Sequence, residues 1–96
     1  MNTTIYKYPL DEERVGNIIS APIFKPLKVD YQNGIPMLWA IINEDAEPEE
    51  WRVLRIGTGW PVAGLEFENY LNTTVAQSEP FVWHWFCSKL VEGFDM

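Results

Sequence analysis

The sequence contains one cysteine, one histidine, and seven lysines and arginines in 96 residues. A single cysteine excludes an internal disulfide and any cysteine-rich zinc module. So few cations argue against binding to a nucleic-acid backbone, which needs clustered positive charge to release counterions. We therefore expect no metal site, no cofactor and no direct contact with nucleic acid.

Long apolar runs are also missing. No stretch approaches the roughly 18–20 apolar residues that a membrane-spanning helix requires. The first four residues, Met-Asn-Thr-Thr, do not begin a basic region followed by an apolar run, so they do not resemble a secretion signal. We expect a cytoplasmic protein that makes no contact with a membrane.

Acidic and aromatic residues are abundant instead. Fourteen carboxylates against seven cations give a net charge of −7, and aromatic residues make up 15% of the chain. Such a charge keeps a protein soluble and suits a partner with a basic surface. The length fits one domain over residues 1–96, and we expect an ordered core over about residues 4–90 with a frayed tail over 91–96.

Short extended segments separated by turn residues predict the fold class. Asn33 and Gly34 lie between two extended runs and tolerate positive φ, which predicts a type I′ hairpin turn. One short helix is possible over residues 62–68. The expected strands cover residues 4–8, 15–20, 27–32, 36–43, 51–56, 70–77 and 81–89. This pattern predicts an all-β protein: a small antiparallel sandwich or partly open barrel of about six or seven short strands, with at most one short helix.

Residues 81–86, with the sequence Phe-Val-Trp-His-Trp-Phe, form the most apolar of these strands. Alternation places Phe81, Trp83 and Trp85 on one face and Val82, His84 and Phe86 on the other. Both faces are largely apolar. The segment is therefore expected to be a central strand covered on both sides, or a strand with one face against a partner.

His84 and Cys87 are the residues that could suggest catalysis. They are three positions apart, so on a regular strand they point to opposite faces, whereas a nucleophile and its base need contact at about 2.6–3.2 Å. A buried histidine bonded to a backbone carbonyl and an inert cysteine explain both residues. We expect no catalytic residues and no enzymatic activity.

Residues 44–50 carry five carboxylates, and two interpretations stay open. The segment is a solvated loop between strands, or it is an electrostatic docking patch for a basic partner. Asp11, Glu12 and Glu13 could extend such a patch if the two runs are adjacent. The candidate binding residues in this segment are Glu44, Asp45, Glu47, Glu49 and Glu50.

Gly57, Thr58 and Gly59 are interpreted as a glycine-rich strand exit that turns Trp60 back over the core. The strand before them places Arg52 on one face and Arg55 on the other. Pairing with a carboxylate is the default expectation for both arginines. The functional alternative is a pocket edge in which Trp60 and Arg52 or Arg55 hold an anion or an aromatic ligand.

Five short segments together resemble a family of small proteins encoded mainly by tailed bacteriophages, for which no activity is established. They occur in the family's order: Ile-Tyr-Lys-Tyr-Pro-Leu from residue 5, Gln-Asn-Gly-Ile-Pro from 32 with Leu-Trp-Ala from 38, Arg-Ile-Gly-Thr-Gly from 55 with Pro61, and Pro-Phe-Val-Trp-His from 80 with Phe86. The family pattern has a histidine where this chain has Trp60, and residues 63–69 also depart from it. The resemblance implies a phage or prophage origin, and location in the host-cell cytoplasm.

Three classes of function follow as hypotheses. The leading one is a small acidic, non-enzymatic binding protein that occupies or inhibits a host protein, with Trp60 as contact and residues 44–50 steering a basic partner. The second is a small-ligand protein that holds a nucleotide-like molecule by aromatic stacking with Arg52 or Arg55. The third is a structural homo-oligomer assembled through free strand edges.

Overall fold

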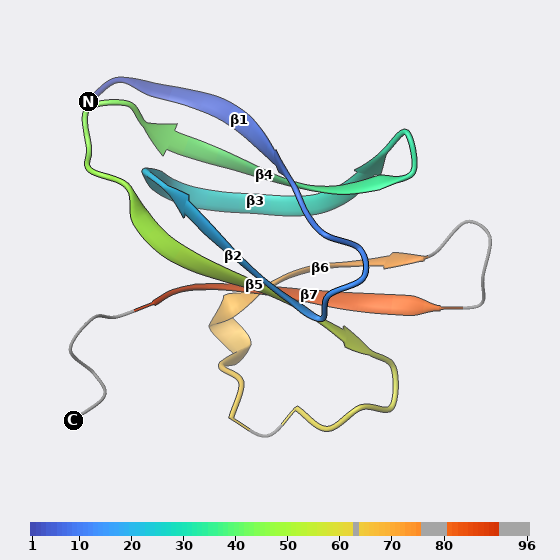
Figure 1. Ribbon diagram of the computed structural model, residues 1–96. Coiled ribbons are helices and arrows are strands. Elements are labelled where there is room, and N and C mark those ends of the chain that lie inside the picture. The colour runs from blue at the N-terminus through green and yellow to red at the C-terminus, as the bar shows by residue number, and fades with distance from the viewer. Residues whose placement is uncertain (63, 76–80, 91–96) are drawn as a thin grey trace.

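The computed structural model describes residues 1–62, 64–75 and 81–90, and these residues form two antiparallel sheets packed face to face (Figure 1). The predicted all-β sandwich is confirmed. The first sheet contains, in spatial order, β1 (Thr3–Pro9), β4 (Ile35–Asn43) and β3 (Ile23–Gln32). The second contains β2 (Gly16–Ala21), β5 (Glu49–Gly57), β7 (Val82–Lys89) and β6 (Tyr70–Val75).

Four of these strands belong to one long bent hairpin. β2 and β3 are separated only by Pro22, and β4 and β5 by residues 44–48. β3 pairs with β4 in one sheet, β2 pairs with β5 in the other, and Asn43 N–H donates to Pro22 O (2.9 Å) at the corner between them. The half of the hairpin next to its tip, formed by β3 and β4, thus lies in the three-stranded sheet, and the other half, formed by β2 and β5, lies in the four-stranded sheet. At its tip Asn33 (φ 53°) and Gly34 (φ 79°) both have positive φ, as predicted for a type I′ turn.

The core lies between the two sheets. On β4 the alternate residues Leu38, Ala40 and Ile42 are buried in one cluster with Val53 and Trp85 from the other sheet. β7 is a central strand between β5 and β6, and Phe86 on its outer face is only 8% exposed. The prediction of a central strand is therefore confirmed, while Val82 and His84 on its outer face are only half-buried.

The start of β3 differs from the prediction. The strand begins at Ile23 rather than at residue 27, and Pro26 lies inside it. β3 is an edge strand, where a missing backbone N–H is tolerated, and its pairing with β4 shifts register between Ile23 and Lys25 and again between Pro26 and Lys28. These irregularities accommodate the proline without ending the strand.

The helix expected over residues 62–68 is wrong. The described residues of this segment contain a single 3₁₀ turn, Phe67–Asn69, in a connection that runs away from the four-stranded sheet and back (Figure 1). Gly64 has a φ of 86°, which a right-handed helix cannot contain. Residues 63, 76–80 and 91–96 lie outside the described residues, and they include the tail that was expected to be frayed.

The Asn72 side chain joins the neighbouring edges of the two sheets. Asn72 of β6 accepts a hydrogen bond from Val29 N–H (2.9 Å) and donates one to Val29 O (2.7 Å) on β3. A carboxamide has the donor and acceptor of a peptide group, so it substitutes for a neighbouring strand at this point. The free edge of β3 is thereby satisfied at a fully buried residue.

Candidate functional site

The exit from β5 folds back on itself, as predicted. Trp60 N–H donates to Gly57 O (3.0 Å), and Gly59 has a φ of 91°, which favours glycine. The Trp60 indole lies directly against Gly57, where an added Cβ would be 2.8 Å from the ring. Gly57 is therefore required for the close approach of this ring.

Trp83 is the centre of an aromatic group at this end of the molecule. Its ring centroid is 5.5 Å from that of Trp60, in an edge-to-face arrangement, and 5.6 Å from that of Phe81. The Arg55 guanidinium carbon lies 4.4 Å from the Trp83 ring centroid. Trp60 and Phe81 remain 43% and 48% exposed. We call these four residues the aromatic end.

Arg55 is held by a backbone carbonyl rather than by a carboxylate. Its Nη1 donates to Glu12 O (2.5 Å), which brings the turn containing residues 11–13 to the aromatic end. Within the described part of the chain neither Arg52 nor Arg55 forms an ion pair, so the expected carboxylate pairing is not found there. The π face of Trp83 and the Glu12 carbonyl contact the cation in its place, while the buried Arg55 Nε has no hydrogen-bond partner among the described residues.

The two candidate arginines do not share a site. Arg55 is half-buried on the inner face of β5, whereas Arg52 is exposed on the outer face of the same strand. Tyr31 of the other sheet lies near Arg55: burial first, and then the Glu12 carboxylate, raise the pKa of Tyr31. Of the two arginines, Arg55 alone joins Trp60 at the aromatic end.

The acidic residues of segment 44–50 lie at the opposite end of β5. We call this segment the acidic loop. Eight residue steps of about 3.3 Å separate Glu49 from Gly57, roughly 26 Å in all. Thr4 Oγ1 donates to Glu44 (2.7 Å), Asn2 N–H donates to Asp45 (3.1 Å), and Lys89 pairs with Glu49 (3.4 Å). Glu47 and Glu50 are exposed like the other three.

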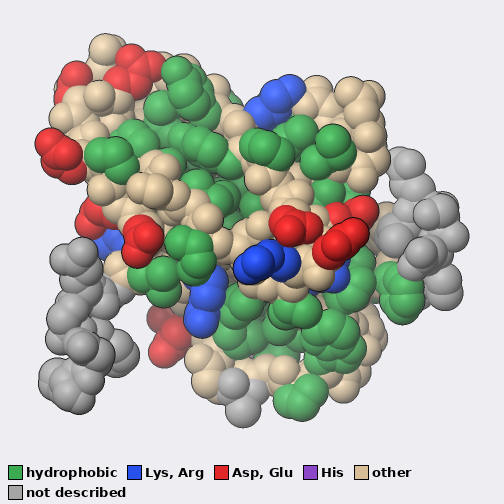
Figure 2. Space-filling model, viewed as in Figure 1, with side chains coloured by type: hydrophobic (Ala, Val, Ile, Leu, Met, Phe, Trp, Pro, Cys, Tyr) green, Lys and Arg blue, Asp and Glu red, His purple; other side chains and the backbone are tan. Residues whose placement is uncertain are grey.

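The two acidic runs therefore do not form one patch. β1 begins opposite Asn43, beside the acidic loop, and ends opposite Met37, after which residues 11–13 reach Arg55. On the face shown in Figure 2, a belt of charged side chains separates two groups of hydrophobic ones, with acidic side chains also gathered at the upper left.

His84 forms a hydrogen-bonded chain that sequence reasoning missed. Its Nε2 lies 2.9 Å from Thr58 Oγ1 and its Nδ1 lies 2.9 Å from Thr73 Oγ1, which is itself 2.6 Å from the Tyr70 hydroxyl. The expected bond from His84 to a backbone carbonyl is wrong. We call Thr58, His84, Thr73 and Tyr70 the His84 chain. Its members come from the β5 exit, β7 and β6, and no sequence pattern links them.

A cleft of about 280 Å³ lies beside the His84 chain. It combines apolar and aromatic walls with hydroxyl and imidazole groups, the usual composition of a ligand site. The lining residues are Ile56, Gly57, Thr58, Gly59, Trp60, Val62, Tyr70, His84 and Phe86. Of the candidates named from the sequence, Trp60 is the one that this cleft contains.

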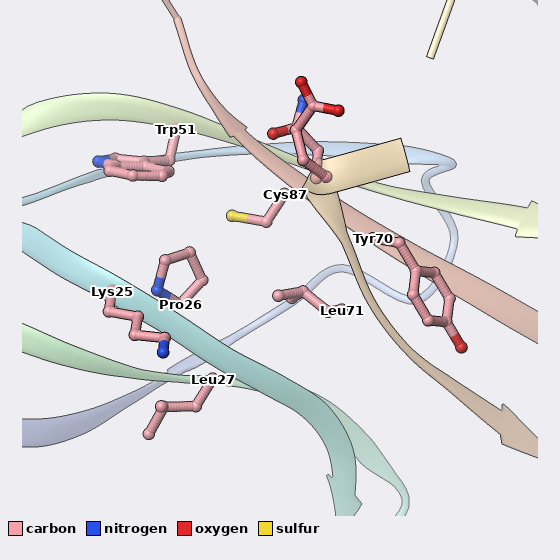
Figure 3. A pocket seen from close by; sticks show the side chains of 9 residues that line it. Lys25, Pro26, Leu27, Trp51, Tyr70, Leu71 and Cys87 are labelled. Carbon is pink, nitrogen blue, oxygen red and sulfur yellow. The ribbon is translucent and has the colours of Figure 1, made fainter. Parts of the chain in front are cut away.

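A second hollow, of about 410 Å³, opens between β3 and the start of β6 (Figure 3). The Cys87 sulfur lies between Trp51 and Pro26, while the Tyr70 hydroxyl points away from them. Burial raises the pKa of the Cys87 thiol to about 12, so the nucleophilic thiolate does not form near neutral pH. Cys87 faces the core and His84 the outer side of the sheet, as the strand alternation predicts.

Two absences can be stated for the described residues. No group of three or more histidine, cysteine, aspartate or glutamate side chains among them is placed to hold a metal ion. The same residues form no helix that is long and apolar enough to cross a membrane.

The chain belongs to the family described as "Domain of unknown function (DUF7352)", which it matches over residues 1–92. This match includes every strand and all members of the aromatic end, the acidic loop and the His84 chain. Searches of curated proteins and of solved structures returned no significant match.

Proposed function

We propose that this protein is a non-enzymatic binding protein of phage origin that occupies a host protein, and that the aromatic end is its contact surface. The observation that carries this proposal is the pair of half-exposed rings, Trp60 and Phe81, that both pack against Trp83. Tryptophan and arginine dominate the energetic centres of protein interfaces. A rigid group of rings also loses little conformational entropy when it binds.

The charge of the protein supports a particular kind of partner. The net charge of −7 favours a partner with a basic surface. Residues 11–13 adjoin the aromatic end through Glu12, whereas the acidic loop is roughly 26 Å away, about three Debye lengths at physiological salt. Residues 11–13 are therefore the stronger steering group for a contact at the aromatic end, and the acidic loop is the weaker one.

The test is capture from host lysate with the wild-type protein and with Trp60→Ala/Phe81→Ala. The double variant should lose a stoichiometric host partner, because it removes both exposed rings. Ile18→Ala, an exposed apolar residue on the other sheet face, is the matched control and should retain it. Equal capture by all three proteins would refute the contact surface.

Association kinetics with the captured partner test the steering. Asp11→Asn/Glu12→Gln/Glu13→Gln should slow association and flatten its dependence on salt. Neutralising Glu44, Asp45, Glu47, Glu49 and Glu50 should have a smaller effect, although it removes more charge. The reverse ranking would place the contact near the acidic loop.

Assembly through the outer face of the three-stranded sheet is a second candidate. Ile5 and Ile35 are 59% and 46% exposed there, but Lys7 and Lys28 lie opposite Trp39 on the same face. A two-fold pair of these faces would bring lysines together, which weakens it. Light scattering tests this candidate, because a monomer at tens of micromolar excludes a stable homo-oligomer.

A further inference from the structure

We infer that the cleft beside the His84 chain is a binding site for an uncharged, planar heteroaromatic group of the nucleobase or nucleoside class. Its walls include the Trp60 and Phe86 rings and the Ile56 side chain. Flat apolar walls favour a flat ligand that can stack or slide between them. The volume of about 280 Å³ is just below the usual range of roughly 300–1,000 Å³, which limits the ligand to one or two rings.

The absence of charged side chains from the described lining indicates that the ligand is uncharged. Among the described residues that line the cleft, none is an aspartate, glutamate, lysine or arginine. A bound phosphate would find no cation there, since Arg55 is held by Trp83 and by the Glu12 carbonyl. The cleft therefore suits the base of a nucleotide and not its phosphate.

The His84 chain gives this cleft an adaptable polar edge. In one arrangement Thr58 O–H donates to His84 Nε2, Nδ1–H donates to Thr73, and Thr73 O–H donates to Tyr70. Thr58 then presents only lone pairs to the cleft, and Tyr70 can donate outward. In the reverse arrangement Tyr70 donates inward and Thr58 can donate outward.

In the His84 chain, one terminal hydroxyl is thus a free donor whenever the other terminal hydroxyl is an acceptor. Thr58 and Tyr70 both line the cleft, so a ligand that carries a donor and an acceptor at separate positions on its rim can satisfy both. Nucleobases carry donors and acceptors at several positions around the ring. Because the chain can reverse as a unit, the same site can accept either orientation of such a ligand.

This inference is independent of the proposed protein contact. Phe81 and Arg55 belong to the aromatic end but do not line the cleft, whereas Thr58 and Tyr70 line the cleft and do not belong to the aromatic end. Trp60 is shared. Variants at Phe81 and at Thr58 therefore separate the two activities.

The experiment is a titration of isotope-labelled protein, followed by NMR and calorimetry, with adenosine, guanosine, cytidine and uridine as probes. We expect at least one nucleoside to bind saturably, with the largest shifts at Thr58, Tyr70 and the His84 ring. AMP should bind no more than threefold tighter than adenosine. Indole, which has a planar ring and one donor but no lone-pair acceptor, should bind at least tenfold more weakly than the best nucleoside.

Two variants test the polar edge directly. Thr58→Val keeps the shape of the side chain and Tyr70→Phe keeps the ring, and each should weaken nucleoside binding by tenfold or more. Phe81→Ala should leave that binding unchanged. The inference is overturned if no nucleoside binds at millimolar concentration, if both hydroxyl variants bind like the wild type, or if AMP binds tenfold tighter than adenosine.

Discussion

The two ends of β5 are built on different principles. The acidic loop is continuous in sequence, exposed throughout, and held by contacts to Asn2, Thr4 and Lys89. The aromatic end is assembled from the turn before β2, the last residues of β5, its exit, and the start of β7. Its geometry therefore depends on several elements of the sandwich, whereas the acidic loop is one segment held by exposed polar contacts. Substitutions should damage the two ends unequally.

The largest effect is expected from Asn72→Ala, which should loosen both ends together. The substitution leaves Val29 N–H and Val29 O unpaired at a buried position, at a cost of about 2–4 kcal/mol of unfolding free energy. Urea denaturation measures the loss. Asn72→Asp keeps an acceptor for Val29 N–H and loses the donor to Val29 O, so amide exchange at Val29 should stay slower than in the alanine variant. A loss of unfolding free energy below about 0.5 kcal/mol for Asn72→Ala would show that the edge of β3 does not need the hydrogen bonds from Asn72.

Gly57→Ala should break the aromatic end alone. The new Cβ would lie 2.8 Å from the Trp60 ring, so the ring must leave, at a cost of about 1–3 kcal/mol. Tryptophan fluorescence should shift to the red and the near-ultraviolet circular dichroism of the Trp60–Trp83 pair should fall. Gly59→Ala strains a positive φ but meets no atom within 4 Å, so it should lower stability by about 1–2 kcal/mol and keep the spectrum. Identical spectra for the two variants would contradict the assignment.

Arg55→Met should have a smaller effect at the same end. Methionine keeps most of the apolar stem and loses the contact with the Trp83 ring and the bond to Glu12 O, for about 0.5–2 kcal/mol. Amide exchange in residues 11–14 should accelerate, while exchange around the acidic loop should not change. Arg52→Met, on the exposed face, is the matched control and should change neither stability nor exchange. Faster exchange at both ends would mean that they are coupled.

The smallest effect is expected from Glu44→Gln/Asp45→Asn in the acidic loop. Both groups are exposed, and bonds of this kind contribute little because water and salt screen them. The unfolding free energy should change by no more than about 0.5 kcal/mol, and the spectrum of the aromatic end should be unaltered. A loss above about 1 kcal/mol would show that the acidic loop is a structural support.

The same contrast explains how much the sequence could predict. The positive-φ turn at Asn33 and Gly34 and the central place of β7 follow from turn chemistry and from the apolar character of both strand faces, and both were predictable. The start of β3 was not, because an edge position and register shifts make Pro26 tolerable. The helix expected over residues 62–68 failed because the backbone of Gly64 is left-handed.

The candidate sites were less predictable than the fold. Trp60, Arg55 and the five carboxylates were identified individually, but only the folded chain separates the last group from the first two by the length of β5. His84 and Thr58 are 26 residues apart, and His84 and Thr73 are 11 apart. A hydroxyl that bonds an imidazole across strands leaves no periodic pattern, so the His84 chain could not be found from the sequence.

The long bent hairpin also sets an order in which the molecule can assemble. Its Asn33 and Gly34 tip closes the smallest possible loop, so β3 and β4 can pair at little entropic cost and extend from there like a zipper. When this pairing passes the Pro22 corner, β2 and β5 come into register without a separate search. β1 and β7 must then dock from distant parts of the chain. In pulsed hydrogen exchange, protection should therefore spread outward from the tip, and the edge at β6 should be the last to form.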